Sequence, residues 1–68
     1  MKVKYFRDTD TALLEFRDAP VSQTREINED ICIDLDADGN LVSITIEHAE
    51  RNSRLPSVVV EEIGRNIA

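Results

Sequence analysis

The segment "DLDADGNLVSITIE", Asp34–Glu47, decides the fold of this chain. Apolar and polar residues alternate on both sides of Asp38-Gly39, a pair that suits a hairpin turn because glycine takes positive φ values at little cost. Such alternation is typical of strands with one buried face. We assign one set to the core, Ile31, Ile33, Leu35, Val42, Ile44 and Ile46, and the other to solvent, Leu41, Ser43, Thr45 and Glu47.

The same segment also resembles the start of a calcium-binding loop. Asp34, Asp36 and Asp38 occupy alternating positions and Gly39 follows them. An EF-hand loop needs a bidentate glutamate at its twelfth position and helices on both sides. The twelfth residue here is Thr45, and the flanks are strand-like. We therefore interpret the aspartates as part of a turn. Weak binding of a divalent metal or small molecule by the three carboxylates, with His48 as a further ligand, is the alternative.

Three more strand-like segments precede this hairpin. Lys2–Arg7 and Ala12–Arg17 alternate in the same way, and Asp8–Thr11 between them has side chains that favour tight turns. Pro20 interrupts the chain, and Val21–Ile27 is polar enough for a sheet edge. The first 47 residues therefore predict an antiparallel sheet of four to five short strands, built around two hairpins. Ala12, Leu14 and Phe16 join its core face.

A C-terminal helix over about residues 56–67, after a connection at 48–55, is expected to cover that face. Pro56 suits a first helical turn, and Val59, Ile63 and Ile67 recur at helical spacing. The three consecutive valines 58–60 instead favour a strand, which leaves that possibility open. We predict a single α+β domain over residues 1–68.

The size and composition of the chain limit how it is stabilised. At 68 residues it lies near the lower limit for a self-sufficient core. Its single cysteine excludes an internal disulfide, and no Cys/His cluster is present to hold zinc. No apolar run approaches the roughly 18 residues of a membrane span, and the start turns polar too early for a signal peptide. We expect a soluble cytoplasmic protein with no membrane contact.

Acidic residues dominate the charge. Fourteen acidic and eight basic residues give a net charge of -6, which disfavours binding to nucleic acid. Residues 26–38 contain no base. We predict that a basic partner is attracted to this acidic rim, although a solvated edge that only aids solubility is the alternative. The rim comprises Glu26, Glu29, Asp30, Asp34 and Asp36, followed by Asp38.

The sequence contains no recognisable catalytic set. His48 is the only histidine, and Cys32 lies among acidic residues that should make it a poor nucleophile. The two glycines, Gly39 and Gly64, are too far apart for a phosphate-binding loop. We therefore expect neither enzymatic activity nor a cofactor.

Three apolar residues fall on the predicted solvent face: Leu13, Cys32 and Leu41. On so small a chain they could form a self-association surface, and a homodimer would ease the shortage of core. Isolated exposed apolar residues are, however, common on monomers. We predict a homodimer and keep the second reading open.

Three segments, Lys2–Tyr5, Asp8–Phe16 and Asp34–Ala49, together resemble a family of small bacterial and archaeal proteins, domain of unknown function 2283. The most specific part is the pattern D-x-D-x-[DE]-G-x-[LIV]-V-[GS]-I-x-I. Leu13 stands where many members carry tyrosine, and Ser43 where they usually carry glycine. The resemblance implies the α+β fold and assigns no catalytic residue.

Some members of that family are encoded beside small proteins that look like toxin components. The resemblance therefore implies a partner-binding or antitoxin-like role. Together with the acidic rim, it leads us to expect a protein–protein interaction module with a small basic partner.

Overall fold

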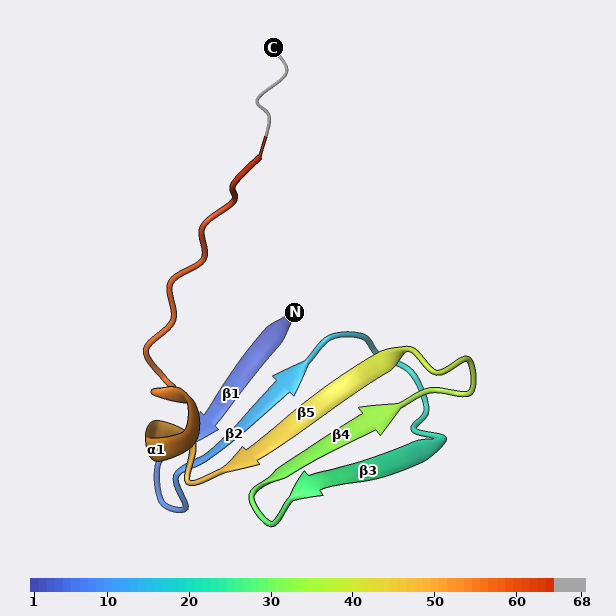
Figure 1. Cartoon of the computed structure of the whole chain (residues 1–68), viewed down its shortest axis with the longest axis horizontal. Helices are drawn as coiled ribbons and strands as arrows, with labels where there is room; N and C mark the ends of the chain where they lie inside the picture. Colours follow the sequence, from blue (N-terminus) through green and yellow to red (C-terminus); the bar gives the residue numbers. More distant parts are fainter. Residues whose placement is uncertain (65–68) are drawn as a thin grey trace.

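The computed structural model describes residues 1–64 and shows one sheet with a short helix at one end (Figure 1). The α+β class and the antiparallel sheet are confirmed. The elements in chain order are β1 (Lys2–Phe6), β2 (Thr11–Glu15), β3 (Gln23–Asn28), β4 (Ile31–Leu35), β5 (Leu41–Glu47) and α1 (Ala49–Ser53).

The strands lie in the order β1-β2-β5-β4-β3, and every neighbouring pair is antiparallel. The strand β5 is therefore central, and β1 and β3 form the edges. The connection 16–22 runs from β2 to β3 past the ends of β5 and β4, where Phe16 and Ser22 donate backbone hydrogen bonds to Val42 and Leu35. Edge strand β3 is exposed along its whole length, as its polar sequence predicts.

The strand register gathers apolar side chains on one face. Ile46 lies opposite Ala12 and Ile31, and Ile44 lies opposite Leu14 and Ile33. Residues directly opposite each other in antiparallel strands point to the same side of the sheet. The predicted core face is therefore confirmed across β2, β5 and β4. We call it the apolar face, and the reverse side the polar face.

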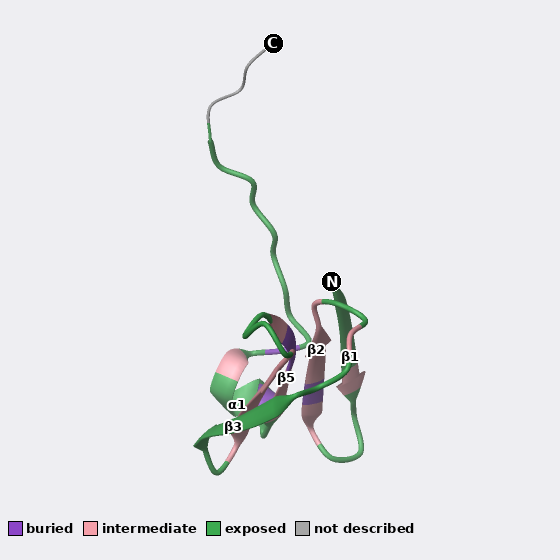
Figure 2. Ribbon diagram, turned by 90° about the vertical axis from the view of Figure 1, so that its right-hand side faces the viewer, coloured by how far each residue is buried: buried purple, intermediate pink, exposed green. Residues whose placement is uncertain are grey.

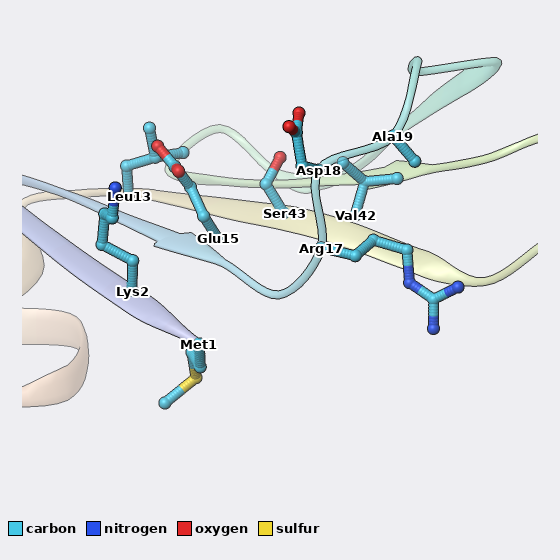
Figure 3. Close-up of a pocket in the computed structure, with 9 residues that line it drawn as sticks. All are labelled: Met1, Lys2, Leu13, Glu15, Arg17, Asp18, Ala19, Val42 and Ser43. Atoms are coloured by element: carbon cyan, nitrogen blue, oxygen red, sulfur yellow. The ribbon is translucent and has the colours of Figure 1, made fainter.

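A bulge changes this alternation at the start of β5. Asp34 lies opposite Ser43, but the next residue, Leu35, lies opposite Leu41, so Val42 is an extra residue in β5. Figure 3 shows the side chains of Val42 and Ser43 on the same side of the sheet. The predicted placement of Leu41 outward and Val42 inward is wrong, because one inserted residue reverses the pleat.

The predicted helix at 56–67 is also wrong over its described part. The helix α1 forms earlier, in the segment expected to be a connection, and residues 56–64 run away from the sheet without helical structure (Figure 1). Arg54 ends α1 in a left-handed conformation with φ 64°. Valines 58–60 then resist helix formation because they are β-branched. The remainder of the predicted helix lies outside the described residues.

The core occupies only one end of the apolar face. Ala12, Ala49 and Leu55 are buried there, and Tyr5, Leu14 and Ile46 pack against them. We call these six residues the covered end. At the opposite end Ile33, Leu35, Leu41 and Ile44 are only half-buried, and we call them the open end. Figure 2 shows how few buried positions the ribbon contains. Within residues 1–64 no helix is long and apolar enough to span a bilayer.

Candidate interaction surfaces

The open end is the part of the apolar face that lies outside the buried cluster. Its four residues come from the two adjacent strands β4 and β5, and on β1 the side chain of Val3 adds to the same face, since Val3 lies opposite Leu14. Towards β3 the face ends at Arg25, opposite Ile33, and at Gln23, opposite Leu35. None of the paired strand positions on this face is acidic, in a chain with fourteen acidic residues.

The polar face carries a hydrogen-bond network that crosses three strands. The carboxylate of Asp34 accepts bonds from the hydroxyls of Thr24 at 2.6 Å and Ser43 at 2.7 Å. Farther along, Lys4 pairs with Glu15 at 2.8 Å, and the hydrogen bond from Lys4 holds the pKa of Glu15 below its usual value. These contacts stabilise the register of the sheet and occupy both oxygens of Asp34.

Asp36 organises the β4–β5 turn. Its Oδ1 accepts the backbone N–H groups of Asp38 and Asn40, both at 2.9 Å, and its Oδ2 lies 3.5 Å from the guanidinium of Arg17. Gly39 has φ 82°, a conformation that glycine adopts without strain. This segment therefore has the geometry of a hairpin turn. Across residues 1–64 no three His, Cys, Asp or Glu side chains are grouped in a way that could hold a metal ion.

Asp30 connects the β3–β4 turn to α1. Its carboxylate accepts a hydrogen bond from Asn52 at 3.0 Å and lies 3.1 Å from Nδ1 of His48 and 3.3 Å from the guanidinium of Arg51. The Asn52 hydrogen bond, followed by the His48 contact, holds the pKa of Asp30 below its ordinary value. His48 thus pairs with an acidic residue eighteen positions away, and its observed contact is structural.

Asp10 holds the other side of the same helix. Its side chain accepts the N–H of Glu50 at 3.1 Å, and its backbone carbonyl accepts the N–H of Ala49 at 2.8 Å. The hydroxyl of Tyr5 donates to the same carboxylate at 2.7 Å, and this bond raises the pKa of Tyr5. Asp10 therefore satisfies two N–H groups that every helix leaves free at its start. The sequence contained no local signal for this contact, because forty residues separate Asp10 from Glu50.

The predicted acidic rim is divided by these contacts. Asp30, Asp34 and Asp36 are half-buried and engaged with neighbouring side chains. Glu26 and Glu29 are exposed and form no ion pair with any other described residue. The part of the rim accessible to a partner is therefore on β3 and its turn, together with the exposed Asp38 in the β4–β5 turn.

The predicted self-association trio is not on one face. Cys32 and Leu13 lie on either side of Thr45 on the polar face, where each is half-buried. Leu41 is transferred to the apolar face by the bulge. Leu13 also lines a shallow depression beside Lys2, Glu15 and Asp18 (Figure 3). The concentrated apolar surface is thus on the opposite face from the one predicted.

Together the fold and these surfaces define a small α+β domain, in which a single sheet carries an apolar face only partly covered by its helix. Residues 2–50 match the family described as "Protein of unknown function (DUF2283)", which covers most of the 68 residues. The chain belongs to this family, as its hairpin pattern indicated. No curated protein and no solved structure matches the chain.

Proposed function

We propose that the protein is a protein–protein interaction module. The observation that carries this proposal is the open end, where four large aliphatic side chains on one face of the sheet are only partly buried. Stable domains bury a sheet face against a second layer of structure. The short helix α1 supplies this layer only at the covered end. A macromolecular partner would complete the burial.

The partner class we propose is a small basic protein, as in an antitoxin-like pair. The support is the net charge of -6 together with the exposed carboxylates of Glu26 and Glu29 on β3 and its turn. Contacts between exposed charges weaken as salt screens them. Association with such a partner should therefore depend strongly on ionic strength.

Affinity capture with the tagged full-length chain in its native host tests this proposal. We expect a basic protein to be retained at low salt and released as the salt concentration rises. A tagged chain with Glu26→Gln and Glu29→Gln should retain less of it, whereas a matched chain with Asp8→Asn and Asp18→Asn, both exposed and outside the acidic rim, should not. Capture of no protein, or capture unaffected by either double variant, would count against the basic partner.

The metal-binding alternative at Asp34, Asp36 and Asp38 gains no support from the geometry. Asp34 bonds to two hydroxyls, and Asp36 to two backbone N–H groups and Arg17. We therefore do not carry it forward as a second function.

A further inference from the structure

We infer that the open end of the apolar face packs against the same face of a second copy of this chain, forming a two-layer homodimer. This inference rests on the proposed function as an interaction module and identifies what covers the apolar face. It relocates the self-association surface from the polar face, where Leu13 and Cys32 lie, to Ile33, Leu35, Leu41 and Ile44.

The first reason is the missing layer. Two packed sheets lie about 10 Å apart, with the side chains of their inner faces filling the space between them. In this chain one end of the apolar face is covered by α1 and Leu55, whereas no described element lies over Ile33 and Ile44. An identical sheet would supply the missing layer with matching apolar side chains.

The second reason is the distribution of charge. A two-fold symmetric contact brings each patch against itself, so a charged patch would repel its own copy. The paired strand positions of the apolar face contain no acidic residue, and Arg25 lies only at its border with β3. The acidic residues that give the chain its charge of -6 remain outside such an interface. The face is therefore suited to a second copy.

The C-terminal segment is the competing occupant. It exposes Val59 by 81%, Val60 by 82% and Ile63 by 87%, and it runs away from its own sheet (Figure 1). In this arrangement it covers none of the apolar face. If a tail covered that face in solution, charges placed on the tail would disrupt the contact, whereas our inference predicts that they leave the dimer intact.

The experiment compares Ile44→Lys with Thr45→Lys in the full chain. Both residues are β-branched neighbours in β5, but Ile44 lies on the apolar face and Thr45 on the polar face. Light scattering coupled to size exclusion, over concentrations up to about 1 mM, should give about 15 kDa for the wild type, twice the chain's 7.7 kDa. Ile44→Lys should raise the dissociation constant of the dimer at least about tenfold, because a buried unpaired charge is costly. Thr45→Lys should leave it nearly unchanged.

Other results overturn the inference. The inference is wrong if the wild type is monomeric at every concentration, or if Ile44→Lys leaves the dimer intact. It is also wrong if the double variant Val59→Lys, Ile63→Lys loses the dimer. Far-UV circular dichroism checks that each variant is folded. If Ile44→Lys unfolds, Val3→Lys replaces it in the light-scattering test, because Val3 is already 37% exposed at the edge of the same face. Capture of a basic partner by a monomeric chain would reject the dimer and leave the proposed interaction function standing.

Discussion

The two ends of the apolar face both carry aliphatic strand residues, but only the covered end contains a buried cluster. At the covered end Ala12 is fully buried, and Leu14 and Ile46 pack against Ala49 and Leu55. At the open end the residues paired across β4 and β5, Ile33 with Ile44 and Leu35 with Leu41, are only partly buried. The alternation of apolar and polar residues along the strands is the same at both ends. The difference is the segment that follows β5.

Hydrogen bonds to two aspartates, Asp10 and Asp30, determine where that segment lies. Asp10 accepts N–H groups from the start of α1, and Asp30 accepts bonds from His48, Arg51 and Asn52. They hold the helix over the ends of β2 and β5 that contain Ala12 and Ile46. A helix of five residues, at about 1.5 Å per residue, extends less than 8 Å and leaves the rest of the face uncovered.

The largest expected effect contrasts a deletion at each end. Leu55→Ala should lower the free energy of unfolding by about 2–4 kcal/mol, because it leaves a cavity in the buried cluster that residues 1–64 form. Ile33→Ala should lower it by only about 1 kcal/mol in the monomer, because this side chain is only partly buried and lies outside the buried cluster. Urea unfolding followed by circular dichroism at low protein concentration measures both.

The same pair of variants at high protein concentration sharpens the contrast. If a second copy covers the open end, Ile33→Ala should become more destabilising as the concentration rises, since stability is then linked to association. Leu55→Ala should show the wild-type dependence on concentration. Equal losses for the two variants at low concentration would show that the two ends are equally buried.

The strands were predictable because their pattern is local. Each of the five strand segments expected from alternation and turn residues is present, with ends shifted by one or two residues. Gly39 and Asp38 placed the β4–β5 turn correctly because a residue with positive φ is a backbone requirement that sequence reveals directly. The Asp34–Glu47 hairpin pattern also identified the family.

The rest depended on contacts between distant residues. A bulge inserts Val42 without any sequence signal and exchanges the faces of Leu41 and Val42. The helix lies in a polar segment, where Asp10 and Asp30 bind it. The apolar spacing of Val59 and Ile63 had placed the predicted helix too far towards the C-terminus. Apolar periodicity alone does not distinguish a segment that packs on its own sheet from one that does not. The sequence alone therefore did not predict which end of the apolar face is left uncovered.

A smaller effect is expected at Gly39, in the turn beside the open end. Gly39→Ala should lower the free energy of unfolding by about 1 kcal/mol, because φ 82° strains any residue with a Cβ atom, although nothing lies within 4 Å of the added atom. Asp38→Ala is the matched control, since the neighbouring Asp38 contributes only its backbone N–H to the turn. Urea unfolding measures both, and equal stability of the two variants would contradict the strain argument.

The final prediction concerns Asp30 and the attachment of α1 that creates the covered end. The pKa of Asp30 is held below its ordinary 3.8 by Asn52, then His48 and Arg51. A depressed pKa means that the folded protein binds this proton less readily than the unfolded chain, so its stabilising contribution is present above about pH 4 and disappears as acid protonates the folded carboxyl.

Asp30→Asn should therefore be less stable than wild type at pH 6, and the difference between them should shrink as the pH falls from about 4 to 2.5. Glu29→Gln, an exposed neighbour, should follow the wild-type curve. Some acid sensitivity should persist in Asp30→Asn, because Lys4 also lowers the pKa of Glu15. Urea midpoints across this pH range decide the matter. A difference between wild type and Asp30→Asn that stays constant with pH would mean that Asp30 anchors the helix through its shape and not through its charge, and the covered end would then owe its position mainly to Asp10 and Leu55.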